Sequence, residues 1–245
     1  MLLVDIGNTR LKWALWVEQG IVRRGAAAHA GCPAQALLAA QWHDLPTPQR
    51  VAVASVADST LAQAVVAWSR RRWGCETLLA RSRAEGYGVR NAYTDPGRLG
   101  VDRWLAMVGA HALGVGDCCI IDCGTAITLD ALTSDGRHLG GVILPGAALM
   151  RVALYCNTRR IPKELNGQIT VLGTSTRDCV WGGTAYAAAA AIDRISEDMA
   201  ANLDSDMQRL LTGGDAEAML PYLRHAYRLE PDLVFHGLYR IAQST

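Results

Sequence analysis

The sequence lacks the patterns that mark several large classes of protein. Its 245 residues contain no Cys-x-x-Cys pair and no His-x-x-x-His pair, so no local zinc-binding spacing is present. Neither a Gly-x-x-x-x-Gly-Lys-Ser/Thr nor a Gly-x-Gly-x-x-Gly pattern occurs, which excludes two common glycine-rich nucleotide loops. The alanine-rich apolar stretch at 185–192 is far shorter than the roughly 20 residues that a membrane span requires.

An excess of one charge is also missing, because the formal net charge is only +1. No basic field therefore favours a nucleic acid or a membrane surface, and we expect neither as a partner. Residues 1–5 have no basic segment and reach an acid at once, which is not typical of a signal peptide. The seven cysteines are odd in number, and we expect buried, reduced thiols in a cytoplasmic protein.

What the sequence does contain is an Asp-x-Gly turn that occurs twice. Residues 5–9 read Asp-Ile-Gly-Asn-Thr, residues 122–126 read Asp-Cys-Gly-Thr-Ala, and each turn follows an apolar strand. Glycine lets backbone N–H groups approach a phosphate, an Asp can position Mg²⁺, and Lys12 can offset phosphate charge. One such turn is common in proteins. Two copies half a chain apart predict a duplicated phosphate-binding lobe.

Apolar spacing predicts the remaining elements. Strands are expected at 2–4, 11–16, 51–56, 77–80, 119–121, 127–132, 138–144 and 209–211, with a further strand starting near 21. Helices are expected at 34–42, 61–72, 102–113, 179–203 and 233–242, and from about 147 and 215, with loops at 81–100 and 159–176. Both halves therefore begin strand–turn–strand–strand. We expect two similar α/β lobes of residues 1–110 and 111–245.

Two further motifs are candidates for binding the nucleoside and the acceptor. Residues 212–215 read Thr-Gly-Gly-Asp, and the double glycine suits a flat nucleoside, although a helix start explains it equally well. Residues 100–103 read Gly-Val-Asp-Arg at the start of a predicted helix. Phosphoryl transfer to an alcohol requires a carboxylate to accept the hydroxyl proton, which is the role suggested for Asp102. Alternatively, Asp102 only favours the positive end of its helix. Placement alone leaves these two interpretations even.

In this order and spacing, the motifs resemble those of the type III pantothenate kinases, which belong to the acetate and sugar kinase, Hsc70 and actin superfamily. Residues 140–146 match that family as well, and the resemblance covers almost the whole chain. It implies an α/β fold of two actin-like, ribonuclease H-like lobes with the active site in the cleft between them. It also implies ATP-dependent phosphorylation of pantothenate to 4'-phosphopantothenate, the first step of coenzyme A biosynthesis. A cytoplasmic homodimer that uses Mg²⁺ with ATP and a monovalent cation, K⁺ or NH₄⁺, is expected.

The resemblance further implies roles for individual residues. Asp102 is expected to be the catalytic base, and Asp122 is expected to bind the monovalent cation. The residues expected to bind ATP are Asp5, Ile6, Gly7, Asn8, Thr9, Arg10, Leu11, Lys12 and Thr125. Those expected to bind pantothenate are Tyr93, Gly100, Val101, Asp102, Arg103 and Thr176. Thr176 rests on matching the Ser-Thr pair at 175–176 to an Asn-Thr pair of the family.

Two other functions compete with this interpretation. One is a catalytically inactive regulatory accessory protein of the same fold, against which the intact Asp5, Asp102, Asp122 and Thr125 argue. The other is a sugar-kinase or actin-like ATPase with a different acceptor. The short chain and the Gly-Val-Asp-Arg motif argue against that second alternative.

Overall fold

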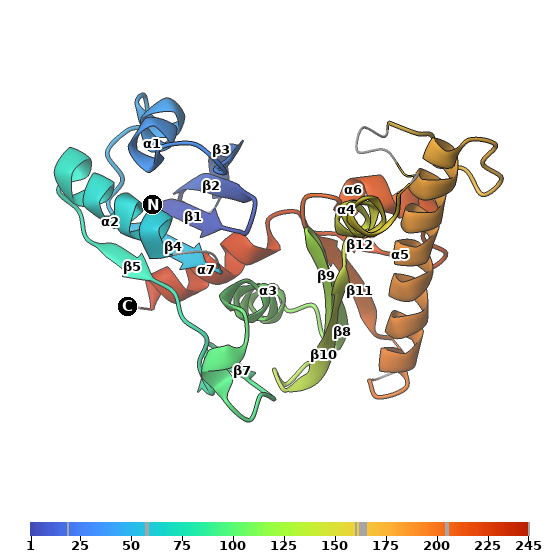
Figure 1. The fold of residues 1–245 in the computed structure, drawn as a ribbon. Coiled ribbons are helices and arrows are strands. Elements are labelled where there is room, and N and C mark those ends of the chain that lie inside the picture. The colour runs from blue at the N-terminus through green and yellow to red at the C-terminus, as the bar shows by residue number, and fades with distance from the viewer. Residues whose placement is uncertain (19, 57–58, 160, 162–165, 204–205, 245) are drawn as a thin grey trace. The chain divides into compact units, whose positions relative to one another are not determined.

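A computed structural model describes residues 1–18, 20–56, 59–159, 161, 166–203 and 206–244. The chain divides into two compact units (Figure 1). Unit 1 contains Met1–Gly114 together with Asp232–Thr245, and unit 2 contains Val115–Pro231. The expected lobes, 1–110 and 111–245, therefore differ from these units at the C-terminus. The last helix, α7 (Leu233–Gln243), lies against β1 and β4 of unit 1, and nothing in the local sequence specifies that return.

Unit 1 is built on a five-stranded mixed sheet with the order β3-β2-β1-β4-β5. The first three strands form antiparallel pairs, whereas β4 and β5 run parallel to β1. Their bounds are β1 (Leu2–Ile6), β2 (Arg10–Val17), β3 (Gly20–Ala28), β4 (Val51–Ser55) and β5 (Thr77–Leu79). The three β1 side chains Leu2, Val4 and Ile6 alternate onto one face and are fully buried there.

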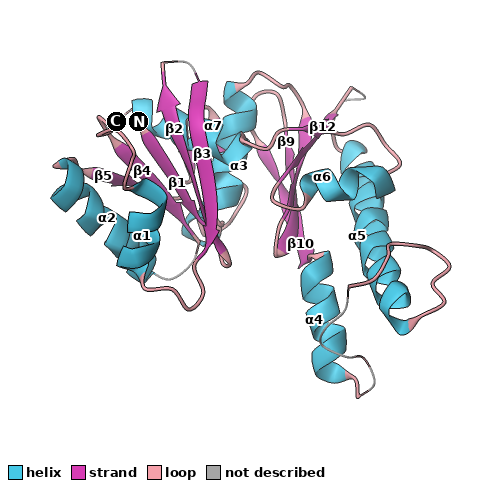
Figure 2. Ribbon diagram, turned by 90° about the horizontal axis from the view of Figure 1, so that it is seen from above, coloured by secondary structure: helices cyan, strands magenta, loops and turns pink. Residues whose placement is uncertain are grey.

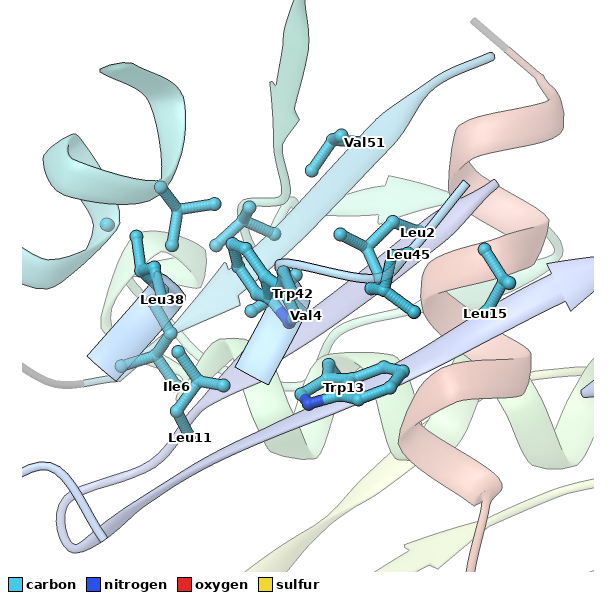
Figure 3. Packing of buried hydrophobic residues seen from close by; sticks show 13 residues of the cluster. Leu2, Val4, Ile6, Leu11, Trp13, Leu15, Leu38, Trp42, Leu45 and Val51 are labelled. Atoms are coloured by element: carbon cyan, nitrogen blue, oxygen red, sulfur yellow. The ribbon is translucent and has the colours of Figure 1, made fainter. Parts of the chain in front are cut away.

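Helices cover both faces of this sheet (Figure 2). On one face, α1 (Ala34–Trp42) and α2 (Ser59–Trp73) close a core of leucines, valines and tryptophans around Trp42 (Figure 3). On the other face, α7 packs against α3 (Val101–Ala112). Trp16 of β2 anchors α7 there, stacking on Tyr239 with ring centroids 4.1 Å apart.

Unit 2 repeats the architecture of the first sheet. Its strand order is β10-β9-β8-β11-β12, again with two antiparallel pairs followed by two parallel ones. The bounds are β8 (Cys118–Cys123), β9 (Ala126–Leu132), β10 (His138–Pro145), β11 (Gln208–Thr212) and β12 (Arg228–Leu229). Each Asp-x-Gly turn therefore joins the central strand of its sheet to the equivalent antiparallel neighbour, β1 to β2 in unit 1 and β8 to β9 in unit 2. The predicted α/β fold with two similar sheets is confirmed.

The longest helix of unit 2 is α5 (Thr176–Ala200). Ser175 caps its start, because the Ser175 Oγ accepts a hydrogen bond from the Asp178 N–H at 3.2 Å. Its buried alanines pack on β8 and β9. The remaining helices are α4 (Ala147–Asn157), α6 (Ala216–Met219) and the 3₁₀ turn η2 (Leu220–Tyr222). None of the described helices is long and apolar enough to cross a membrane.

The segment predicted as a loop at 81–100 contains structure of its own. A two-stranded hairpin, β6 (Glu85–Gly86) and β7 (Val89–Arg90), is followed by the 3₁₀ turn η1 (Pro96–Arg98). Tyr87 and Gly88 form the hairpin turn with φ of 56° and 85°, the signs that a type I′ turn requires. The predicted starts of α5 near 179 and of β3 near 21 are corrected to Thr176 and Gly20.

Candidate functional site

The first Asp-x-Gly turn is a tight connection between β1 and β2. The Gly7 N–H donates to the Arg10 carbonyl at 3.0 Å, which closes the turn. Asp5 is the direct cross-strand partner of Lys12. Paired residues of antiparallel strands share one face of the sheet, so the Asp5 carboxylate and the Lys12 ammonium belong to the same face. Because Val4 and Ile6 point into the core around Trp42, that face is the opposite one.

Within the predicted ATP-binding run, the side chains divide into two kinds. Ile6 and Leu11 are fully buried in the core, so only their backbone groups can serve a ligand. Asn8, Thr9 and Arg10 are exposed at the turn. The turn can therefore offer backbone N–H groups, one hydroxyl and one guanidinium to an anion.

The second Asp-x-Gly turn is one residue shorter. The Gly124 N–H donates to the Ala126 carbonyl at 3.1 Å, and the Gly146 N–H donates to the Thr125 carbonyl at 3.0 Å. Gly146 is packed so closely that a Cβ added to it would lie 2.8 Å from the Thr125 oxygen and would collide with the Gly124 oxygen. Because Gly146 is also the N-cap of α4, this helix begins directly on the turn. The free N–H groups of its first turn add to the backbone donors in this region.

The double glycine at 213–214 lies against the same turn. Thr212 pairs with Asp122 across β11 and β8, and the Asp215 N–H donates to the Cys123 carbonyl at 2.9 Å. Gly213 has a φ of +100°, and a Cβ there would collide with the Asp122 carboxylate and the Cys123 carbonyl oxygen. Only glycine meets both demands. The predicted nucleoside motif and the predicted cation ligand are thus neighbours in unit 2.

The oxygens beside Gly213 have the chemistry that a hard cation requires. A carboxylate from Asp122 and a backbone carbonyl from Cys123 both approach the space that a Cβ would fill. Burial raises the pKa of the Cys123 thiol to about 12. Within the described part of the chain, no group of three or more His, Cys, Asp or Glu residues could hold a metal ion. An oxygen set of one carboxylate and one backbone carbonyl fits K⁺ or NH₄⁺ better than a transition metal.

A fixed positive charge lies near the double glycine. The Arg151 guanidinium of α4 stacks over the Trp181 ring, 4.1 Å from its centroid, and donates to the Thr184 hydroxyl at 3.2 Å. Partial burial lowers the pKa of Arg151, and attraction to the Asp215 carboxylate opposes that shift. Sequence patterns gave no sign of this cluster, because its members come from α4, α5 and the residue that caps α6.

The acceptor motif begins α3 in unit 1. The Asp102 Oδ1 accepts a hydrogen bond from the Arg103 N–H at 2.8 Å, and a Cβ added at Gly100 would lie only 2.5 Å from that oxygen. Gly100 therefore leaves the space in which the carboxylate lies. The Arg103 side chain is almost fully buried, and its Nη1 donates to the Tyr93 hydroxyl at 2.7 Å. Four of the predicted acceptor residues thus form one local cluster. The fifth, Val101, turns its side chain inward.

Asn91 orders the loop before α3, a role to which no sequence motif pointed. Its Oδ1 accepts from the Tyr93 N–H at 2.9 Å, while its Nδ2 donates to the Arg83 and Pro96 carbonyls at 3.1 and 3.2 Å. Three hydrogen bonds from one side chain fix the position of Tyr93.

Thr176 belongs to a different unit from the other predicted acceptor residues. It is the first residue of α5, directly after the capping Ser175, and its side chain is exposed. The serine that departs from the family's Asn-Thr pair is therefore a competent helix cap.

Comparison with known proteins places this geometry in context. Residues 1–198 match the sequence pattern of the type III pantothenate kinase family. A type III pantothenate kinase of Nitrosococcus oceani is 39% identical over an alignment that covers 100% of this chain and 94% of the relative. Another, from Halorhodospira halophila, is 37% identical, with 97% and 95% covered.

Solved structures resemble the chain more distantly. A Campylobacter jejuni protein assigned to the Baf family of transcriptional activators has a TM-score of 0.61 at 20% identity, covering 100% of this chain and 98% of that one. A Sinorhizobium meliloti protein assigned as a 2-dehydro-3-deoxygalactonokinase has a TM-score of 0.58 at 14% identity, with 99% and 98% covered. At these identities the likeness concerns the fold alone, and it supports the actin-like, two-lobed class.

Proposed function

Because this chain belongs to the type III pantothenate kinase family, we propose that it transfers the γ-phosphoryl group of ATP to the alcohol of pantothenate. The product is 4'-phosphopantothenate, and the reaction is the first step of coenzyme A biosynthesis. The observation that carries the proposal is the doubled turn: both sheets end their central strand in an Asp-x-Gly hairpin. A phosphoryl-transfer enzyme needs dense backbone donors for phosphate, and this arrangement provides them twice.

ATP is assigned to the two turns. Backbone N–H groups of the two turns bind phosphate oxygens, apart from those of Gly7 and Gly124, which close the turns, and the Thr9 and Thr125 hydroxyls help. Asp5 helps position the Mg²⁺ that accompanies ATP, and Lys12 on the same sheet face offsets phosphate charge. Of the double glycine, Gly214 leaves room for the nucleoside, because a Cβ there would meet no atom within 4 Å.

Pantothenate is assigned to the cluster of Tyr93 and residues 100–103. Asp102 aligns the substrate alcohol and accepts its proton as the oxygen attacks the γ-phosphorus. Arg103 supplies positive charge for the carboxylate of pantothenate, and its hydrogen bond to Tyr93 keeps both side chains in one arrangement. Alignment and charge neutralisation account for most of the catalysis in such transfers.

The monovalent cation, K⁺ or NH₄⁺, is assigned to Asp122 and the Cys123 carbonyl beside Gly213. When bound, the cation supplies positive charge close to the second phosphate turn. An Asp122→Asn variant is expected to lose the stimulation of turnover by K⁺ over Na⁺. Stimulation that persists in the variant would contradict the assignment of the cation to Asp122.

We further propose that the enzyme is a cytoplasmic homodimer that uses α4 as a contact surface. None of the α4 residues is buried. Val152 of α4 is 53% exposed, and Ile143 of the adjoining β10 is 62% exposed. Val152→Asp is expected to convert a dimer to a monomer in sedimentation velocity. The matched control is Val22→Asp, which alters a valine of β3 that is 62% exposed. A dimer that survives Val152→Asp would exclude this surface.

The central experiment measures ADP release with ATP, Mg²⁺ and K⁺, in the presence and absence of pantothenate. Release that depends on pantothenate is expected. Release without pantothenate would favour an ATPase with another acceptor. No release in either condition would favour an inactive accessory protein.

Asp102→Asn tests the catalytic base. It is expected to keep the fold and ATP binding while lowering the turnover number by about 10²–10⁴-fold. Asp95→Asn is the matched control, because Asn also accepts the Gly97 N–H that Asp95 accepts at 3.2 Å. Near-normal turnover of Asp102→Asn would exclude Asp102 as the catalytic base.

A further inference from the structure

His29 touches the first phosphate turn through two groups. It directly follows β3, and its Nε2 lies 2.8 Å from the Gly7 carbonyl oxygen. Its own N–H donates to the Thr9 carbonyl at 3.4 Å. A carbonyl oxygen only accepts hydrogen bonds, so Nε2 carries a proton and donates in this contact. One residue therefore holds both ends of the segment at 7–9.

Holding the Gly7 carbonyl fixes the direction of the next amide. In a planar trans peptide, the C=O and the following N–H point in opposite directions, and no cis peptide occurs among the described residues. With the Gly7 oxygen directed at His29, the Asn8 N–H points away from the imidazole. Among the described residues, no acceptor pairs with this N–H, so it is available to a ligand. Without the imidazole, the Gly7–Asn8 peptide loses the contact that sets its orientation.

The second turn is held differently. Gly146 follows β10 as His29 follows β3, and its N–H likewise donates to the threonine carbonyl of its turn, here Thr125. Gly146 has no side chain, and a Cβ there would collide with the Gly124 carbonyl, the counterpart of the Gly7 carbonyl. At equivalent positions, a side-chain donor holds the first turn and close backbone packing holds the second.

We propose that His29 is a positioning residue for nucleotide binding, which aims the Asn8 N–H at a phosphate oxygen of ATP. This inference rests on the proposed function, because it takes the first turn to be a phosphate site. His29 acts through the Gly7–Asn8 peptide and takes no part in proton transfer to or from the substrate.

Three variants test the role of His29. His29→Phe keeps a ring and removes the donor, whereas His29→Gln keeps an N–H donor. His43→Phe is the control, since His43 is exposed at the end of α1 and its imidazole makes no hydrogen bond with the described residues. Each variant is assayed for kcat and KM with ATP and with pantothenate, and its Tm is measured.

Loss of one hydrogen bond that orients a donor is expected to lower kcat/KM for ATP about tenfold in His29→Phe. The KM for pantothenate and the Tm should stay close to those of the unaltered enzyme, His29→Gln should recover most of the loss, and His43→Phe should match the unaltered enzyme. Unchanged kcat/KM for ATP in His29→Phe would overturn the proposal. So would an equal loss for both substrates with a lowered Tm, which indicates a purely structural role.

A direct binding measurement separates this proposal from the proposed function. Titration calorimetry with a non-hydrolysable ATP analogue and Mg²⁺ needs no pantothenate. If the unaltered protein binds the analogue but does not phosphorylate pantothenate, the proposed acceptor is wrong, and the Kd of His29→Phe still decides the role of His29. A roughly tenfold weaker Kd supports it. An equal Kd, or no binding by the unaltered protein, overturns it.

Discussion

The contact between α3 and α7 can be used to test whether the C-terminal helix packs in unit 1 as described. Gly237 of α7 faces the backbone of α3 at Leu105. A Cβ added at Gly237 would lie 2.7 Å from the Leu105 carbonyl carbon and 3.0 Å from its Cα, with the carbonyl oxygen nearer still. These are backbone atoms of a helix, so they cannot rotate out of the way. Gly237→Ala therefore forces the two helices apart.

Two opposing effects set the size of the change. Gly→Ala in an unobstructed helix interior stabilises by about 0.5–1 kcal/mol, because glycine has the larger backbone entropy to lose. Ordinary contact with the carbonyl carbon alone requires a shift of about 0.7 Å, the nearer oxygen requires more, and overpacking of this kind destabilises by about 1–3 kcal/mol or more. We expect net destabilisation of about 1–2 kcal/mol, which lowers Tm by roughly 2–8 °C in a chain of this size.

Gly183→Ala is the matched control, measured with Gly237→Ala by differential scanning calorimetry. Gly183 also lies inside a helix, α5, but a Cβ there would meet no atom within 4 Å. It should leave Tm unchanged or raise it by a few degrees. Gly237→Ala is therefore expected to lower Tm, whereas Gly183→Ala is not. If Gly237→Ala also raised Tm, α7 would not approach α3 at Leu105, and the reasoning would be refuted.

Three further predictions concern the turns and the thiols. Gly100→Ala should lower kcat by at least tenfold with little change in Tm, because the new Cβ displaces the Asp102 carboxylate; unaltered kcat would argue against this placement. Gly146→Ala should raise KM for ATP, because its Cβ distorts the second turn; an unchanged KM would dissociate that turn from nucleotide binding. At pH 8, a thiol reagent should modify the exposed cysteines, which are Cys32, Cys156 and Cys179. It should spare the buried Cys118, Cys119 and Cys123, because burial raises the pKa of each thiol to about 12. Rapid modification of all seven cysteines would contradict this burial. The pKa values of these three thiols lie above the unfolded value of about 9. The protonated thiols therefore make their full contribution to stability below pH 9, and this contribution is lost as pH rises towards 12.

Much of the fold followed from local patterns, because most elements are long enough to show their periodicity. The valine-rich run at β4 and the apolar run at α3 are buried along most of their length, and both were predicted within two residues. By contrast, β3 was predicted only as a start near 21. Its sequence, Gly-Ile-Val-Arg-Arg-Gly-Ala-Ala-Ala, has no strict alternation, and most of its side chains are exposed. An edge strand held mainly by backbone pairing to β2 leaves little signal in its side chains.

Short elements and long-range contacts were out of reach of the sequence. The strands of the β6–β7 hairpin have two residues each, too few for any period, and the turn uses Tyr87 where Asn or Gly is usual. His29 meets Gly7 across 22 residues, and α7 meets β1 across most of the chain. The site motifs were recognisable because their residues are contiguous. Asn91, His29 and Arg151 were missed because their partners are not.

The two Asp-x-Gly turns share their place in the sheet but differ in what surrounds them. Beside Asp5, the parallel neighbour is Ala54 of β4, and Lys12 stands opposite on β2. Beside Asp122, the neighbour is Thr212, Thr128 stands opposite, and the Asp122 and Cys123 oxygens lie close to Gly213. A lysine opposite Asp5 favours anionic phosphate with its Mg²⁺, whereas a pair of oxygens without a basic cross-strand partner favours a bare monovalent cation. The surroundings of each carboxylate therefore support different tasks for two turns that are alike in sequence.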